Sequence, residues 1–371
     1  MSGAPPAVPG GPERFHARVL DLETLSETAA ELARTASDPE GVGIMTRKAR
    51  IYPIRLDDVP LRAAPLLKQE MLAVGGDSAH ARGIADHSVD RSTVVLVATY
   101  GQYRRLVPKL ERQPFGLREI ARAIEAALSH RIAHAERTVP GLRRPFRVGA
   151  RTLVMGVVNV TPDSFSDGGR FLDADEAVRH AVELADEGAD LLDLGGESTR
   201  PGAAGVSPDD EWARVGPVLE RLAGSVPVPI SIDTRHAEVA ERALEHGADL
   251  VNDVGGLREA AMRSLVARTG APVIVMHMRG DPTTMRSNLA YADVRGEVYA
   301  ALADACARAR SEGVRPEQLL IDPGLGFGKA PEHDLEILNH LAEFRSLGPP
   351  VVVGASRKSF LGWALGGAPV G

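Results

Sequence analysis

The sequence predicts an α/β protein in which a small α/β domain precedes a larger parallel sheet. Beyond residue 150, short runs rich in Val, Ile and Leu alternate with amphipathic segments, and this alternation is typical of parallel sheets covered by helices. Gly-Ala-Asp follows two of the amphipathic segments, at Gly188 and Gly247, as expected where a helix ends before the next strand. Most of the apolar runs end in polar side chains, and ligands bind at that edge of a parallel sheet.

The composition limits the classes of protein to consider. The chain has 371 residues, of which 44% are hydrophobic, and this is enough for more than one domain. Its 43 Lys and Arg against 50 Asp and Glu give a formal net charge of -7, which argues against a nucleic-acid surface. The single cysteine, Cys306, excludes a disulfide or a cysteine metal site within one chain. We find no signal segment and no membrane-spanning apolar run, so we expect a cytoplasmic protein.

The first 149 residues predict three regions. Residues 1–14 are mostly small residues, Pro and Gly, and predict a disordered tail. Residues 15–135 predict a small α/β accessory domain of unknown role, with a polar solvated loop at residues 75–88. Its expected helices are residues 26–34, 61–74, 102–110 and 117–130, and its expected extended segments are residues 42–45, 50–56 and 93–99. Residues 136–149 predict a linker whose arginines, Arg143, Arg144 and Arg147, are solvated.

Seven strands are expected between residues 150 and 371. They cover residues 152–160, 191–197, 229–233, 250–254, 272–278, 319–322 and 350–354. Amphipathic helices are expected between them, among them residues 175–187, 209–223, 237–246 and 332–347. A (β/α)8 barrel and an open doubly wound sheet both fit this order. We favour the barrel, because nearly every strand ends in a group that can bind or react, and only in a barrel do all these ends converge.

The segment after the first of these strands is the most informative. Asn159 and Val160 end an apolar run, and Thr-Pro-Asp-Ser-Phe-Ser-Asp-Gly-Gly follows them up to Gly169. These residues include too many turn formers for a simple connection, and too many acceptors to be buried without partners. We interpret residues 159–169 as a functional loop.

The strand ends also indicate the chemistry of the ligand. Asp233, Asn252 and Asp322 follow three different strands, and two carboxylates with an amide suit a flat heterocycle that has an aminopyrimidine-like donor edge. Cationic groups lie in the loops 198–202 and 356–358, and the Gly-rich loop 322–329 adds an aromatic ring and a lysine. A strand-end Asp or Asn often only caps the next helix, but seven polar strand ends make capping an insufficient explanation. We expect a substrate with a flat donor face and an anionic tail.

These residues resemble the motifs of dihydropteroate synthases, in the same order along the chain. The similar segments are the loop 159–169, Gly-Gly-Glu-Ser-Thr-Arg-Pro-Gly at 195–202, Ser-Ile-Asp-Thr at 231–234, Asn-Asp-Val at 252–254, Met-His-Met at 276–278, the loop 322–329 and Ser-Arg-Lys-Ser at 356–359. The resemblance covers about residues 150–366. It implies the condensation of hydroxymethyl-dihydropterin pyrophosphate with p-aminobenzoate in folate biosynthesis, with Mg2+. It also implies a TIM-type barrel at residues 150–371, and a homodimer is one possibility.

The resemblance implies a role for each matching residue. Pterin binding would fall to Asp233, Asn252, Asp322 and Lys358, and aminobenzoate binding to Thr199, Arg200, Pro201, Phe327 and Ser356. Asn159 would be the metal ligand. Asp167 would stabilise a pterin-methyl cation that forms as pyrophosphate departs. The residues expected to take part in catalysis are Asn159, Asp167, Arg200 and Lys358.

The resemblance is incomplete at the end of the chain. A (β/α)8 barrel has eight strands, whereas only seven are predicted here, so we expect a barrel that lacks its last strand and helix, as in a truncated protein. The family's last strand bears an Arg-Val-His element that binds pyrophosphate, and this sequence has no counterpart of it. Two alternatives therefore stay open: a pterin-dependent corrinoid methyltransferase, and a catalytically inactive protein that binds a pterin or a partner.

Overall fold

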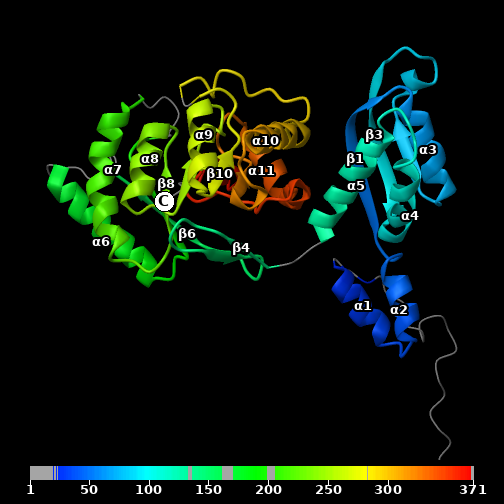
Figure 1. Cartoon of the computed structure of the whole chain (residues 1–371), viewed down its shortest axis with the longest axis horizontal. Coiled ribbons are helices and arrows are strands. Elements are labelled where there is room, and N and C mark those ends of the chain that lie inside the picture. The colour runs from blue at the N-terminus through cyan, green and yellow to red at the C-terminus, as the bar shows by residue number, and fades with distance from the viewer. Residues whose placement is uncertain are drawn as a thin grey trace, which may run out of the picture. The chain divides into compact units, whose positions relative to one another are not determined.

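The computed structural model describes residues 20, 22, 24–132, 136–160, 170–198, 205–281 and 283–368, and for residues 170–173 the backbone alone. The chain divides into two compact units, Met1–Ile132 and Ala133–Gly371. In Figure 1 the first unit runs from blue to cyan, and the second from green to red.

The first unit is a three-stranded antiparallel sheet with helices packed on one face. Strand β3 (Arg91–Thr99) lies between β1 (Ile51–Pro60) and β2 (Asp77–His80). Alternate residues of β3 are buried, and they form one core with the helices that follow each strand. These helices are α3 (Ala63–Ala73), α4 (Tyr100–Leu110) and α5 (Leu117–Ile132), with a 3₁₀ turn, η2 (Arg82–Ile84). Helices α1 (Leu25–Ala33) and α2 (Pro39–Thr46) precede β1 and pack against each other.

Two predictions for the first unit were wrong. Residues 42–45, expected to be extended, belong to helix α2, because Asp38 caps this helix and Pro39 occupies its first turn. The Asp38 side chain accepts hydrogen bonds from the backbone N of Glu40 (2.9 Å) and Gly41 (3.3 Å), and such a cap outweighs the pattern of a short apolar run. Residues 75–88, expected to be a loop, contain β2 and η2, because β3 supplies backbone partners for an additional strand.

The second unit contains a parallel sheet whose strand order follows the chain. Its strands are β6 (Met155–Asn159), β7 (Leu191–Gly195), β8 (Ile230–Asp233), β9 (Leu250–Asp253), β10 (Val273–Met276) and β11 (Leu319–Asp322). The expected parallel α/β sheet is confirmed, and these six strands lie at predicted positions. Of the predicted seventh strand, the described residues contribute an isolated parallel bridge between Val351 and Ile321.

Helices cover one face of this sheet (Figure 1). They are α6 (Arg170–Asp186), α7 (Pro208–Ala223), α8 (Ala237–His246), α9 (Ala260–Thr269), α10 (Val294–Ser311), α11 (Pro331–Asn339) and α12 (Ser359–Ala364), with 3₁₀ segments η3 (Pro316–Gln318) and η4 (Leu341–Leu347). None of the helices in the described ranges is long and apolar enough to cross a membrane.

The other face of the sheet is divided into an apolar half and a polar half. Leu191, Leu250, Ile274 and Leu320 form a separate core cluster near the amino ends of their strands. Because side chains alternate between the faces of a strand, the residues two positions further on share this face. Those positions include Asp193, Asn252 and Asp322. We call this side the hairpin face, because its apolar half is covered by a β-hairpin.

The hairpin consists of β4 (Arg137–Val139) and β5 (Phe146–Val148), which pair antiparallel. Val139 and Phe146 pack into the apolar cluster of the hairpin face. Residues 136–149, expected to form a linker, thus contain an element of the second unit.

A buried aspartate anchors the turn of the hairpin to the sheet. Asp249 is 0% exposed, and its carboxylate accepts hydrogen bonds from the backbone N of Arg143 (3.0 Å), Arg144 (2.9 Å) and Ile230 (3.0 Å). The Arg144 guanidinium lies 3.3 Å from the same carboxylate, and the Arg143 guanidinium donates to the carbonyl oxygen of Ala248 at 2.9 Å. The prediction that these arginines are solvated was therefore wrong for Arg144, whose side chain is only 20% exposed. Arg143 is exposed as predicted, although its guanidinium also finds a main-chain acceptor just before β9.

We expect Asp249→Ala to lower the free energy of unfolding of the second unit by about 3–5 kcal/mol, because it leaves buried backbone N–H groups without their acceptor and removes the carboxylate partner of Arg144. Urea unfolding followed by circular dichroism measures this change. The matched control is Asp209→Ala, which removes an 87% exposed carboxylate paired with Arg242 and should change the same free energy by less than about 1 kcal/mol. Equal effects of the two substitutions would contradict the anchoring role.

Candidate functional site

Four polar side chains gather at the carboxyl end of the hairpin face: Asp193, Asp233, Asn252 and Asp322. We call them the acidic set. The Asn252 amide donates a hydrogen bond to Asp193 Oδ2 at 2.9 Å, and the backbone N of Gly324 donates to Asp322 Oδ1 at 2.7 Å. Asp233 lies opposite Asn252 in the pairing of β8 with β9. The structure thus brings together three residues that the sequence singled out. Asp193 was missed because it stands inside a strand.

Burial and mutual repulsion make the acidic set unfavourable for several negative charges at once. Burial raises the pKa of Asp193, and it raises the pKa of Asp322 to about 6. The pKa of Asp233 is raised well above its ordinary value, first by burial and then by the charge of Asp193 and other acids. A ligand that donates N–H groups to these carboxylates stabilises their ionised forms. The acidic set is therefore suited to a flat ligand that carries several adjacent N–H donors.

Lys358 supplies a positive charge beside the acidic set. Burial lowers its pKa, whereas attraction to Asp322, Asp334 and Asp233 acts in the opposite direction. Its ammonium lies 4.0 Å from the centre of the Phe327 ring, a distance at which a cation is attracted to the face of the ring. The site therefore has one cationic and aromatic wall next to its acceptors.

A buried lysine fixes the loop that carries Phe327. Lys329 is 6% exposed, and its ammonium donates to the carbonyl oxygens of Gly324 (2.8 Å) and Phe327 (3.0 Å) and lies 3.0 Å from His277 Nδ1. Gly324 has a φ of 68°, and a Cβ there would lie 2.0 Å from the His277 carbonyl oxygen, so only glycine fits. Lys329, which we had expected among the groups available to an anion, is instead a structural group.

The environment of Lys329 disfavours charge. Burial lowers its pKa to about 7. Burial and the neighbouring Lys329 lower the pKa of His277 to about 3, so the imidazole is neutral at physiological pH and can accept a hydrogen bond from the lysine.

A second polar cluster, formed by residues after β7, at the start of α7 and after β8, lies beside the acidic set. Glu197 accepts two hydrogen bonds from the Arg235 guanidinium, each 2.9 Å long, and a third from the backbone N of Val206 at 3.1 Å. The Glu197 carboxylate therefore links Glu197 and Val206, which lie on either side of residues 199–204, to Arg235 in the turn after β8.

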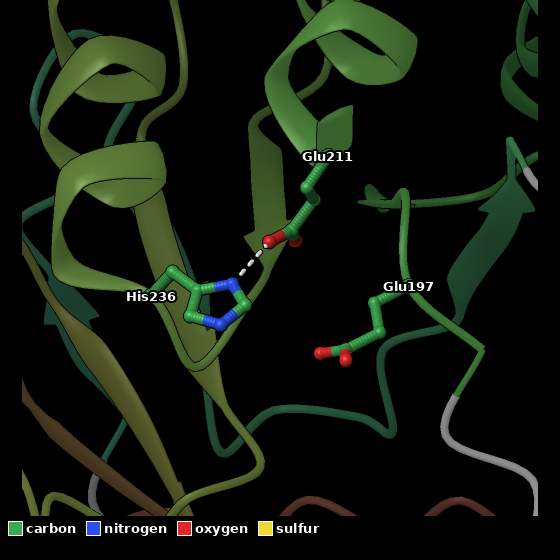
Figure 2. A group of neighbouring side chains, drawn as sticks. All are labelled: Glu197, Glu211 and His236. Atoms are coloured by element: carbon green, nitrogen blue, oxygen red, sulfur yellow. Dashed lines mark hydrogen bonds and ion pairs between the residues drawn. The ribbon is translucent and has the colours of Figure 1, made fainter. Parts of the chain in front are cut away.

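Glu211, at the start of α7, completes the second cluster. It is 0% exposed, and its Oε2 accepts from the hydroxyl of Thr234 at 3.1 Å and lies 2.7 Å from His236 Nδ1 (Figure 2). The sequence analysis did not single out Glu211, which lies in the first turn of α7, or His236, which follows β8 in the turn before α8. A Glu-x-x-Arg pattern at a helix start, as at Glu211 and Arg214, gives no signal that a carboxylate will be buried.

The remaining predicted site residues are only partly described. Asn159 ends β6 opposite Gly195 in the pairing with β7, and Ser356 is exposed two residues before Lys358. Four further predicted site residues lie outside the described residues: Asp167, Thr199, Arg200 and Pro201.

Comparison with known proteins agrees with these motifs. Residues 155–369 match the pterin binding enzymes, and the chain belongs to this family. A probable bifunctional folylpolyglutamate synthase/dihydropteroate synthase of Halobacterium salinarum is 41% identical over 342 residues, which are 92% of this chain and 41% of that protein. The dihydropteroate synthase of Synechocystis is 46% identical over 221 residues, which are 59% of this chain and 76% of that protein. Within the family, the chain is thus a homologue of dihydropteroate synthases.

The fold gives the same relationship. The structure of Xanthomonas albilineans dihydropteroate synthase with 4-aminobenzoic acid superposes with a TM-score of 0.59 and 43% sequence identity, over 62% of this chain and 82% of that chain. The described sheet and helices of the second unit therefore have the α/β arrangement of a dihydropteroate synthase. The chain spans less than half of the bifunctional relative from Halobacterium salinarum.

We expect the buried Lys329 to make stability depend on pH. Its folded pKa of about 7 lies below the ordinary 10.5, so between these values the unfolded chain binds more protons than the folded chain. The free energy of unfolding should then rise with pH from about 7 to about 10. Urea unfolding at several pH values, compared between the wild type and Lys329→Met, isolates this contribution. Parallel curves for the two proteins would show that Lys329 does not titrate in this window.

Proposed function

We propose that this chain is a dihydropteroate synthase, which condenses hydroxymethyl-dihydropterin pyrophosphate with p-aminobenzoate to give dihydropteroate and pyrophosphate. The observation that carries the proposal is the acidic set beside Lys358, because it offers several buried acceptors to one flat donor edge. The homology to dihydropteroate synthases, at 46% identity to the Synechocystis enzyme, supports it.

In this reaction the bond between the pterin methylene carbon and the pyrophosphate oxygen breaks. A bond from that carbon to the aromatic amine nitrogen forms, and the amine loses a proton. Asp233, Asn252 and Asp322 would accept the N–H donors of the pterin and orient the methylene group towards the amine. Lys358, which lies beside the acidic set, would donate a hydrogen bond to the pterin ring. Because it would contact the ring and not the pyrophosphate, it would hold the ring in place while the bond breaks.

The aminobenzoate site is the less constrained part of the proposal. Phe327 would pack on the benzoate ring, and the Ser356 hydroxyl would donate to its carboxylate. Thr199, Arg200 and Pro201 would complete this site, and Asp167 would stabilise the developing positive charge on the pterin. For the last four residues the sequence motifs are the support.

Magnesium is the metal ion implied by the family, and Asn159 is the residue that would hold it. The Asn159 side-chain oxygen faces Gly195, where a Cβ would lie 3.7 Å from it, so the absence of a side chain leaves space beside this oxygen. A hard oxygen donor with open space suits Mg2+, which is usually held by few protein ligands together with water and phosphate oxygens. When bound, the ion would neutralise charge on the departing pyrophosphate.

We also propose that the parallel sheet belongs to a TIM-type (β/α)8 barrel of which residues 150–371 supply all but the last strand and helix, and that residues 15–135 are an accessory domain. The strand order follows the chain from β6 to β11, and the strand ends that bear chemistry gather at one edge, as barrels require.

Direct assay tests the activity. The full chain, incubated with hydroxymethyl-dihydropterin pyrophosphate, p-aminobenzoate and MgCl2, should form dihydropteroate and an equal amount of pyrophosphate, detected by liquid chromatography with mass spectrometry and by a coupled phosphate assay. Binding of both substrates without product would instead identify a binding protein. Methyl transfer from a methylated pterin to a corrinoid would favour the methyltransferase alternative.

We expect Asp233→Ala to weaken pterin binding by about 1–3 kcal/mol, because donors on the ligand lose their buried acceptor. Isothermal titration with a pterin that lacks pyrophosphate measures the change without interference from the anionic tail. Asp304→Ala, which alters an exposed carboxylate on α10, is the control and should bind the pterin like the wild type. Unchanged affinity in Asp233→Ala would remove Asp233 from the pterin site.

We expect Asn159→Ala to change the affinities for the two parts of the substrate differently. In the presence of MgCl2, its affinity for pyrophosphate should fall by roughly tenfold, about 1.4 kcal/mol, whereas its affinity for the pterin alone should stay unchanged. Asn339→Ala, an exposed change at the end of α11, serves as the control. Equal losses for pyrophosphate and pterin would contradict a specific role of Asn159 at the metal.

A further inference from the structure

The second polar cluster contains three side chains whose ligand atoms all lie within 4.8 Å of one another: Glu197, Glu211 and His236. Figure 2 shows the two carboxylates and the imidazole directed towards one another. In the described part of the chain, no other group of His, Cys, Asp or Glu side chains has this geometry. The side chains are 9%, 0% and 18% exposed, respectively, so water screens their charges poorly.

Glu211 has an unsatisfied oxygen at this cluster. Its Oε2 accepts from Thr234 and contacts His236, but its Oε1 has no hydrogen-bond partner in the described structure. A buried carboxylate oxygen without a partner is costly. Since the helix that carries Glu211 holds this carboxylate inside the cluster, a bound cation would remove that cost.

His236 is oriented as a metal ligand would be. Its Nδ1 lies 2.7 Å from Glu211 Oε2, so these two atoms can bind one ion together. Without an ion the imidazole donates from Nδ1 to this carboxylate, because an ionised carboxylate can only accept hydrogen bonds. A bound ion takes the place of that proton, and the neutral ring then carries its proton on Nε2.

Glu197 has acceptor capacity to spare. A carboxylate offers about four acceptor positions, and three are taken, two by Arg235 and one by the backbone N of Val206. Two carboxylates against one guanidinium leave a net charge of -1 when His236 is neutral. Asp233 lies near enough to feel the charges of both Glu211 and Glu197. The cluster thus has open acceptors, an imidazole nitrogen that can bind a metal ion in place of its proton, and an excess of negative charge.

We propose that Glu197, Glu211 and His236 form a binding site for a divalent transition metal such as Zn2+, separate from the magnesium position at Asn159. One imidazole nitrogen and two carboxylate oxygens are ligands that Zn2+ accepts, and three protein ligands leave a fourth position for water. Mg2+ prefers oxygen ligands alone and gives up water reluctantly. The site therefore selects Zn2+ over Mg2+. An ion there ties β7 and α7 to the turn after β8, which carries Asp233.

Zinc titration of the full chain tests the proposal without any assay of catalysis. After treatment with a chelator, the wild type should bind one Zn2+ at this site by isothermal titration without substrates, and MgCl2 should not compete. Glu211→Gln and His236→Gln should each weaken the affinity for Zn2+ by at least about tenfold. His246→Gln, a change to a 42% exposed histidine at the end of α8, should leave it unchanged.

Anomalous diffraction at the zinc edge locates the ion. Crystals soaked in ZnCl2 should give a peak between Glu197, Glu211 and His236. A zinc peak found only at another position would overturn the proposal, and so would equal zinc affinity in His236→Gln and His246→Gln. Competition by MgCl2 would overturn the assignment to a transition metal. If Glu211→Gln does not fold, His236→Gln decides the test, because its partly exposed side chain can be replaced with less disruption. An inactive chain that binds zinc would refute only the proposed synthase activity.

Discussion

The desolvation of carboxylates on the hairpin face is the constraint on which the chemistry of the second unit depends. Asp193 is buried and Asp233 and Asp322 are half-buried in one set, and bringing like charges out of water is costly unless each finds a partner. The protein supplies part of the compensation: the amide of Asn252, a backbone N–H and the attraction of Lys358. The remaining cost of desolvation must be offset by protonation of a carboxylate or by a bound ligand. In the proposed function, selectivity for a donor-rich ring would arise because these carboxylates lack enough donors within the protein.

Such a set can exist only if the rest of the sheet is firmly fixed. The same face carries an apolar cluster two residues earlier along the strands, and the β4–β5 hairpin covers that cluster. Asp249 attaches the hairpin turn to β8 and β9 through buried hydrogen bonds. At the opposite end of the strands, Lys329 and Glu197 fix the adjoining loops from inside. Buried polar groups therefore fix the loops at both ends of the strands, whereas apolar contacts stabilise the sheet between them.

The sequence predicted those features that repeat along the chain or belong to local motifs. Strand positions followed from apolar periodicity, and Asp233, Asn252 and Asp322 were recognisable because each ends a strand. Features that depend on distant partners were missed. Asp193 resembles one polar interruption of an apolar run, and α2 is decided by the cap at Asp38 rather than by its apolar residues. Residues 136–149, rich in Pro and Arg, have the composition of a linker, and their fold depends on Asp249, more than 100 positions later in the chain.

The place of the hairpin has a practical meaning for work on separate parts of this protein. The recognisable motifs begin with β6, so a fragment designed from them would start near residue 150 and discard β4 and β5. That fragment would expose Leu191, Leu250, Ile274 and Leu320 to water and deprive Asp249 of two of its three backbone donors. Aggregation of such a fragment would be a result of the cut and would say nothing about whether the second unit can fold independently. The boundary that respects the packing lies before Arg137.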